Sequence, residues 1–198
     1  MILEILQKAT NSCTAKHLAL SGGLDSTILA YLLKDRKPQC IAVISKNQIA
    51  NDLPYSQMAA QAFDLHLEIK SYDIAQILEA VESTVKILGN FNDIEIRNNI
   101  VPYLAISEIK NSGFDKIITG DGADELFAGY NFLLTKSEDD LKSDLSRLSK
   151  IMHFPSQKIG NSLGVKVESP FCHPDVIKYA QDIPVSKLVN THQGKKYG

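Results

Sequence analysis

Short apolar runs alternate with longer amphipathic segments along the chain. The runs are rich in β-branched residues or alternate between apolar and polar positions, which is typical of strands, and they lie at 16–21, 40–45, 65–71 and 115–118. Between them, apolar residues recur at helical spacing, which predicts helices at 1–10, 25–35, 54–63 and 74–88.

Local signals sharpen some of the predicted helix ends. Asp73 precedes the segment 74–88 and is a good N-cap for it. The helix before the fourth strand is expected to begin near Pro102, with Asn98 or Asn99 as its cap, and to stop at Gly113. A polar stretch at 135–144 begins a last helical region that is expected to reach about residue 152.

Strands separated by helices predict βαβ units. The expected fold is α/β: a Rossmann-like, doubly wound, mostly parallel sheet with helices on both faces. In such sheets, ligands bind outside the carboxyl ends of the strands. The chain has 198 residues, of which 44% are hydrophobic, so we expect one well-packed domain over 1–198.

Composition narrows the function classes. The net charge of −2 gives no basic field for nucleic-acid binding, which makes a nucleic-acid partner an unfavoured hypothesis. No window holds 18 consecutive apolar residues and no signal-peptide layout is present, so we expect a cytoplasmic protein with no membrane partner. Cys13, Cys40 and Cys172 lack CxxC or zinc spacing and are interpreted as reduced structural thiols.

The first chemical motif is SGGLDS, residues 21–26, at the junction of a strand and a helix. Gly22 and Gly23 allow main-chain N–H groups to approach an anion, and the helix start adds positive potential. The motif is neither a Walker A loop nor GxGxxG. The alternative is a simple turn capped by Ser21 or Asp25. The acid Asp25 is unexpected where an anion should bind.

The second motif is TGDGADELFAGY, residues 119–130, which also follows a strand and opens a helix. Its acids Asp121, Asp124 and Glu125 are compatible with simple complementation of a helix dipole. However, two acidic loops at neighbouring strand ends repel each other, at a cost of roughly 4 kcal/mol per pair about 4 Å apart. A divalent cation such as Mg²⁺ removes that cost by bridging carboxylates to phosphate oxygens.

The two motifs together resemble a known family. SGGLDS resembles the pyrophosphate-binding loop of the N-type ATP pyrophosphatases, the PP-loop superfamily with an adenine nucleotide alpha hydrolase-like fold. GDGADELFAGY resembles the second motif of the asparagine synthetase C-terminal domain, which usually reads G-E-G-[SA]-D-E-[LV]-F-G-G-Y. Weaker similarity covers 96–105 and 164–184. The resemblance implies an AMP-forming carbon–nitrogen ligase of asparagine biosynthesis that uses ATP and Mg²⁺, adenylates a carboxylate such as aspartate, and transfers ammonia.

The resemblance also assigns roles by position. The residues implied in pyrophosphate binding are Ser21, Gly22, Gly23, Asp25 and Ser26. The residues implied beside the rest of the nucleotide are Val43 at the adenine, Thr119 and Gly120. The residues implied as Mg²⁺ ligands are Asp25 and Asp124. The candidate catalytic residues are Asp121, Glu125, Arg97 and Lys195.

Two of these candidates have plainer alternatives. Arg97 is expected just before a helix N-terminus, which suits carboxylate or phosphate binding, but an ion pair would also explain it. Lys195 and Lys196 are candidates for phosphate neutralisation, or else belong to a solvated basic tail.

Three departures from the family pattern matter. Met1 is followed by Ile2, so the glutaminase domain with its N-terminal cysteine is expected to be absent, and ammonia would come from solution or from a separate glutaminase subunit. In the run ESPFCH, Glu168 replaces a usual arginine and His173 a usual aspartate, which favours a changed substrate preference. The family's catalytic lysine would fall at or beyond Gly198, so the domain is expected to lack its C-terminal end.

Two other functions stay open at this point. One is a catalytically reduced ATP-binding module that serves a separate amidotransferase partner. The other is adenylation of a different substrate, such as tRNA. A homo-oligomer is compatible with all three hypotheses.

Overall fold

The computed structural model describes residues 2–130, 133, 136–137, 139–141, 143–145, 154–190 and 195–196. The chain forms two compact units built from interleaved segments. Unit 1 comprises Met1–Ser12, Gly120–His153 and Ser169–Gly198, and unit 2 comprises Cys13–Thr119 and Phe154–Glu168. The single domain over 1–198 stays a prediction.

Unit 2 contains a five-stranded sheet in the order β3-β2-β1-β4-β5, and every neighbouring pair is parallel. The strands are β1 (His17–Ala19), β2 (Gln39–Ser45), β3 (Leu67–Tyr72), β4 (Lys116–Ile118) and β5 (Lys166–Glu168). Four of them were expected from the sequence, whereas β5 was not. This topology confirms the predicted α/β, doubly wound fold.

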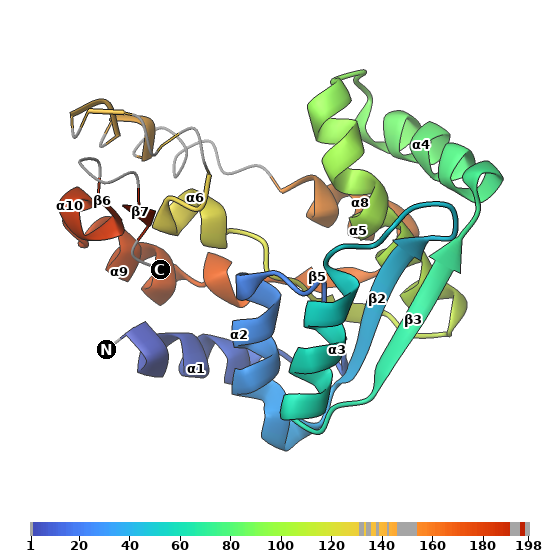
Figure 1. Cartoon of the computed structure of the whole chain (residues 1–198), viewed down its shortest axis with the longest axis horizontal. Coiled ribbons are helices and arrows are strands. Elements are labelled where there is room, and N and C mark those ends of the chain that lie inside the picture. Colours follow the sequence, from blue (N-terminus) through green and yellow to red (C-terminus); the bar gives the residue numbers. More distant parts are fainter. Residues whose placement is uncertain are drawn as a thin grey trace. The chain divides into compact units, whose positions relative to one another are not determined.

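Helices cover both faces of this sheet (Figure 1). Those of unit 2 are α2 (Leu24–Leu33), the 3₁₀ turn η1 (Lys34–Arg36), α3 (Leu53–Ala62), α4 (Ile74–Leu88), α5 (Asp93–Asn111) and α8 (Pro155–Leu163). Helices α2 and α3 pack together against β1, β2 and β3, while α4, α5 and α8 pack together against β2, β4 and β5. The predicted cap of α4 is confirmed, because Asp73 and Gln76 form a reciprocal capping box.

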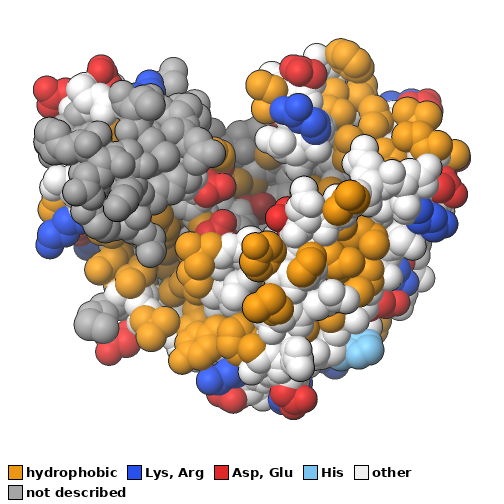
Figure 2. All heavy atoms as spheres, in the orientation of Figure 1, with side chains coloured by type: hydrophobic (Ala, Val, Ile, Leu, Met, Phe, Trp, Pro, Cys, Tyr) orange, Lys and Arg blue, Asp and Glu red, His pale blue; other side chains and the backbone are white. Residues whose placement is uncertain are grey.

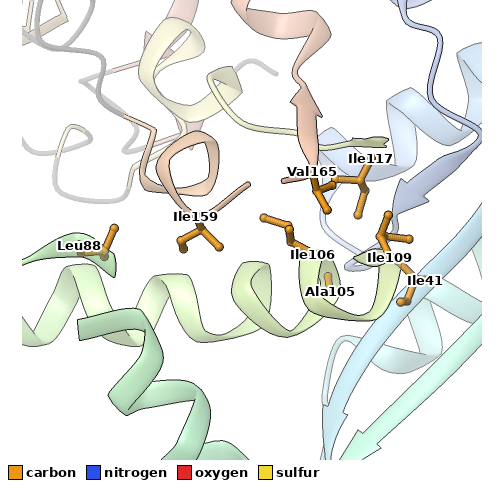
Figure 3. Close-up of a cluster of buried hydrophobic side chains, with 8 residues drawn as sticks. All are labelled: Ile41, Leu88, Ala105, Ile106, Ile109, Ile117, Ile159 and Val165. Carbon is orange, nitrogen blue, oxygen red and sulfur yellow. The ribbon is translucent and has the colours of Figure 1, made fainter. Parts of the chain in front are cut away.

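The main core of unit 2 lies along α5 (Figure 3). Helix α5 contributes Ala105, Ile106 and Ile109, and Ile159 of α8 lies beside them. The remaining members of the cluster are Ile41, Leu88, Ile117 and Val165. Because residues from two strands and three helices meet here, this cluster fixes the α5 face of the sheet.

The start of α5 corrects a sequence-based prediction. The helix begins at Asp93 and not near Pro102, and its N-cap is Asn92, whose side chain accepts a hydrogen bond from Glu95 N (3.0 Å). Pro102 lies inside the helix, where it removes one main-chain hydrogen bond at a cost of about 3 kcal/mol. The buried second half of α5, which includes Ile106, offsets that cost through packing.

The other elements that the structure describes belong to unit 1. They are α1 (Ile2–Ser12), α6 (Ala123–Phe127), η3 (Pro170–Cys172), α9 (Pro174–Gln181), α10 (Val185–Leu188), β6 (Val189–Asn190) and β7 (Lys195–Lys196). Helix α1 packs against α9 and η3, and α6 packs against α9. An apolar cluster that includes Ala128, Leu188 and Val189 holds the end of α6. Most of the helical region expected at 135–152 lies outside the described residues.

The surface of unit 2 exposes apolar side chains over α2 and α3 (Figure 2), among them Leu24, Tyr55 and Met58. Within the described part of the chain, no helix combines the length and apolar character that a membrane span requires.

The contact between α8 and β5 generates a first prediction. A Cβ at Gly160 would lie 2.5 Å from Val165 O and 2.7 Å from Val167 Cγ2. Gly160→Ala should therefore lower the free energy of unfolding by about 1–3 kcal/mol, because the main chain of β5 cannot yield. Urea unfolding at equilibrium measures this change. The control is Ser162→Ala on the exposed side of α8, and equal stability of the two variants would contradict the prediction.

Candidate active site

The loop after β1 is closed by its own hydroxyl groups. Ser21 Oγ and Ser26 Oγ lie 3.1 Å apart, Gly23 N donates to Ser21 Oγ (3.3 Å), and Ser26 Oγ lies 3.1 Å from Gly23 O. Gly23 is the N-cap residue of α2, and no side chain caps this helix. Ser21 thus accepts a hydrogen bond inside the turn, as the capped-turn alternative expects, although the N-cap residue of α2 provides no side-chain cap. Asp25 lies half-buried in the first turn of α2.

Gly22 is required by a close approach within unit 2. Its φ is +87°, and a Cβ there would lie 2.4 Å from Asp52 O and 2.9 Å from Ser56 N. The loop therefore lies directly against the first turn of α3. No local signal pointed to this neighbourhood beyond the helix predicted at 54–63. Asp52 and Ser56 are additions to the candidate site.

Two neighbouring strands border this loop. The pairing of β1 with β2 ends at Ala19–Ile41, whereas β2 continues to Ser45, so the main chain of Val43 lies beyond the end of β1. The Val43 side chain packs against the clusters around α5. On the other side of β1, β4 is paired at Leu18–Ile118 and is followed by the buried Thr119.

The three acids of the second motif belong to unit 1. Asp121, Asp124 and Glu125 are half-buried, and Tyr130 Oη donates to Glu125 Oε1 (2.5 Å). Burial, together with the negative charges of Glu125, Asp124 and Asp121, raises the pKa of Tyr130. The phenol thus stays protonated and remains a hydrogen-bond donor toward this acidic group.

The chain turns after α6 at two small residues, Ala128 and Gly129, and Gly129 lies against the Asp124 carboxylate. A Cβ at Gly129 would lie 1.5 Å from Asp124 Oδ1, so the Asp124 carboxylate lies directly over Gly129. Ala128, where the family pattern usually has glycine, adopts a left-handed conformation with φ +58° and is fully buried. The turn therefore tolerates alanine at 128 and requires glycine at 129.

Cys172 lies beside the same acids in unit 1. Its Sγ donates to Asp121 O (3.4 Å). Burial, with the charges of Asp121 and Glu125, raises the pKa of this thiol to about 12. Cys172 is thus a neutral neighbour of Asp121 and a poor nucleophile, in agreement with its interpretation as a structural thiol.

The remaining candidates, Arg97 and Lys195, belong to other elements, α5 and β7. Arg97 is exposed in the second turn of α5, so the expectation that it precedes a helix N-terminus is wrong. Only the main chain of Lys195 is described, in β7, where it pairs with Asn190 of β6. The position at or beyond Gly198 that was expected for a catalytic lysine lies outside the described residues.

Glu168 corrects a second expectation. Its side chain is buried (8% exposed), and its Oε2 accepts hydrogen bonds from Thr14 N (2.7 Å) and Ala15 N (2.9 Å). Lys166 Nζ lies 3.1 Å from Oε1. Burial opposes ionisation of Glu168, but the N–H of Ala15, Lys166 and the N–H of Thr14 outweigh it and hold the pKa of the carboxyl group below its usual value. Glu168 is therefore engaged by the protein itself, which contradicts the expected substrate-facing role.

His173 also has a structural partner. It is the N-cap residue of α9, and its Nδ1 accepts a hydrogen bond from Asp175 N (3.2 Å). An aspartate, the usual residue in the family pattern, would serve equally well as an N-cap. The helix cap therefore explains this departure without a change of substrate.

A metal ion at these acids would need additional ligands from a bound phosphate group. Among the residues that the structure describes, no three or more His, Cys, Asp or Glu side chains converge as a metal cage. Mg²⁺ is commonly bound by one or two carboxylates together with substrate phosphates, and not by an all-protein cage. Asp25 and Asp124 are each half-buried carboxylates, the type of side chain that such binding uses.

Comparisons with known proteins agree with these motifs. The family model for asparagine synthase matches residues 4–158. The glutamine-hydrolysing asparagine synthetase 1 of Arabidopsis thaliana is 24% identical over 193 residues, and the nodule asparagine synthetase of Pisum sativum is 26% identical over 197 residues. Each match covers 89% of this chain and 33% of the relative, so the chain spans about a third of the length of these curated relatives.

One solved structure that this chain matches is the NMN synthetase from Francisella tularensis. Its TM-score is 0.43 at 17% identity, and the match covers 100% of this chain and 97% of that one.

The contact between Gly129 and Asp124 generates the second prediction. Gly129→Ala should lower the free energy of unfolding by about 1–3 kcal/mol, because the new methyl group must displace the Asp124 carboxylate. Ala128→Gly is the matched control: it relieves about 1 kcal/mol of left-handed strain and loses about 0.8 kcal/mol of methyl burial. Thermal unfolding measures both. A Gly129→Ala variant as stable as Ala128→Gly would contradict the prediction.

The buried carboxylate of Glu168 generates the third prediction, which concerns pH. Its pKa is lowered in the folded state, so its stabilising effect is complete above the ordinary value of 4.5 and is lost as the pH falls through the folded pKa. At pH 7 Glu168→Gln should cost about 1–3 kcal/mol. Urea unfolding at pH 7 and near pH 3 should show that the difference from the unmodified chain narrows with acidity.

The control for this pH series is Glu82→Gln, which alters a surface pair with Lys86 on α4 and should change stability little at either pH. An equal cost of Glu168→Gln at both pH values would show that the ionised carboxylate is not what holds Thr14 and Ala15.

Proposed function

The chain belongs to the asparagine synthase family, and on that premise we propose that it is an ATP-dependent amide-forming ligase that adenylates a carboxylate and transfers ammonia to it. The observation that carries the proposal is the pairing of β1 with β4, since each of the two motifs begins where one of these strands ends. Strand ends at such a reversal of strand order are where ligands bind in open α/β sheets.

The nucleotide contacts follow from this placement. The phosphates of ATP bind the loop formed by Ser21, Gly22, Gly23, Asp25 and Ser26, where hydroxyl and main-chain N–H groups and the start of α2 favour an anion. Adenine binds beside the main chain of Val43, beyond the last pairing of β1 with β2. Thr119 and Gly120 border the nucleotide on the β4 side.

Asp25 and Asp124 are the proposed ligands of Mg²⁺. Bound there with the phosphates of ATP, the ion would offset negative charge on the departing pyrophosphate. Gly129 supports this role of Asp124, because a side chain at position 129 would collide with the Asp124 carboxylate.

The reaction proceeds in two steps of group transfer. An oxygen of the substrate carboxylate attacks the α-phosphorus of ATP, and the bond to the pyrophosphate breaks. Ammonia then attacks the acyl carbon, AMP leaves, and one proton is released. This chemistry requires positioning and charge stabilisation and no side-chain nucleophile.

The acids of the second motif act on the substrate carboxylate and on ammonia. Asp121 lies next to the reacting carboxylate and ammonia, where it accepts the proton that ammonia loses. Glu125, held by Tyr130, keeps its carboxylate in a fixed direction in the same segment. Arg97 and Lys195 supply the cations that a substrate carboxylate and the phosphates require.

Aspartate is the proposed carboxylate substrate. The replacements at Glu168 and His173 raised doubt about it, but both side chains accept hydrogen bonds from main-chain N–H groups of the protein. The same finding removes one of the two reasons for a catalytically reduced ATP-binding module, and the other, the position expected for the catalytic lysine, lies outside the described residues.

The fourth prediction is a direct assay. With ATP, Mg²⁺, aspartate and ammonium, the chain should release AMP and pyrophosphate in equal amounts, and Asp25→Asn should lower the rate by at least about a hundredfold, since a charge that stabilises the transition state is lost. Radiolabelled ATP separated by chromatography measures both products. The matched control is Asp64→Asn, an exposed aspartate paired with Lys37, which should leave the rate unchanged.

The arms of this assay separate the alternatives. Activity with ammonium and none with glutamine would indicate that the nitrogen comes from free ammonia or from a separate glutaminase partner. ATP binding without AMP release across a panel of carboxylates would overturn the ligase in favour of the binding module. AMP formation that depends on added tRNA and not on a free carboxylate would overturn it in favour of tRNA adenylation.

A further inference from the structure

The chain passes four times between unit 1 and unit 2. The passages follow Ser12, Thr119, residue 153 and Glu168. Glu168 is in contact with the unit 2 end of the first and second passages and is itself the unit 2 end of the fourth. The third passage, into α8, has no contact with Glu168 among the hydrogen bonds of the described residues.

The first passage is held by the Glu168 side chain. Its carboxylate binds the N–H groups of Thr14 and Ala15, the residues that follow Ser12 and Cys13. Lys116 Nζ binds Thr14 Oγ1 (2.9 Å) and Arg36 Nη2 donates to Ala15 O (3.1 Å), so this segment is fixed on several sides.

The second passage is held by the Glu168 main chain. Thr119 N donates to Glu168 O (3.0 Å), one residue before the chain enters unit 1 with Gly120. One glutamate thus joins the entry to β1, the exit from β4 and the end of β5. All the atoms involved belong to unit 2.

We propose that Glu168 is a clasp: a positioning residue that holds three chain passages together at the end of β5 and so fixes the start of the 119–130 motif relative to the strand that leads to SGGLDS. An arginine, the usual residue here in the family pattern, has only donors and cannot accept from Thr14 N and Ala15 N. The clasp is therefore a feature of chains that carry an acid at this position.

Hydrogen exchange tests the clasp without ATP. In Glu168→Gln, one oxygen is replaced by an NH₂ group that cannot accept from an N–H, so charge-assisted bonds are lost. Amide exchange at Thr14, Ala15 and Thr119, measured by NMR on the full chain, should accelerate between about tenfold and a hundredfold. Exchange at Cys40, whose N–H binds His66 O inside the sheet, reports global unfolding, and the acceleration at Thr14, Ala15 and Thr119 should exceed the acceleration at Cys40.

The matched control is Glu68→Gln, a strand carboxylate of β3 that pairs with Lys70 and accepts from Gln39. It should leave the three amides unchanged. Acceleration at Thr14 and Ala15 without Thr119 would overturn the clasp, since the two contacts would then be independent. Uniform acceleration, Cys40 included, would also overturn it and indicate general destabilisation.

A kinetic readout rests on the proposed function. Glu168→Gln should lower kcat for AMP formation between about tenfold and a hundredfold while KM for ATP changes little, because misplacement affects the 119–130 motif and not the SGGLDS loop. An unchanged kcat in an active chain would overturn the clasp as a positioning device. If the unmodified chain forms no AMP, the ligase fails, whereas the exchange contrast still decides the clasp.

Discussion

The reversal of strand order between β1 and β4 is the constraint on which the arrangement of the motifs depends. From β1 the chain builds β2 and β3 in one direction, and β4 and β5 are added in the other. Leu18 and Ile118 are paired across the reversal in parallel register, so the carboxyl ends of the two strands lie at the same edge of the sheet. Short central strands of three residues therefore suffice to bring the two motif-bearing segments to adjacent strand ends.

The parts of the fold that depend on local pattern were predictable. Strands β1 to β4, the cap of α4 and the loop before α2 carry their signals within a few residues. The start of α5 was not predictable in the same way, because the rule that proline begins a helix competed with packing that only the assembled core supplies. Strand β5 was missed since its three residues, Lys166 to Glu168, include two charged side chains. Its burial comes from α8 and β4, which the local sequence does not reveal.

The candidate site divides in the same way. The glycines and acids of both motifs were identified from the sequence, but the reason for each glycine was not. Gly22 is required by α3, which begins thirty residues later, and Gly129 by the carboxylate of Asp124. The functions of Glu168 and His173 depend on partners that the residue types alone do not name, and sequence comparison therefore suggested a substrate contact where the structure has a clasp and a helix cap.

Glu168 and His173 make structural contacts within the protein, so neither of them explains which substrate is chosen. Substrate choice is then expected to depend on the acidic segment 121–125. Asp121, Asp124 and Glu125 have neutral neighbours in Cys172 and Tyr130, whose raised pKa values keep both uncharged. A substrate that brings its own carboxylate to this segment adds negative charge to a region that already repels it. Under the proposed function, its binding would be coupled to the arrival of cations, so that metal, nucleotide and acid substrate would bind with positive cooperativity. Selectivity among carboxylic acids would accordingly depend on their charge and reach more than on the residues that differ from the family pattern.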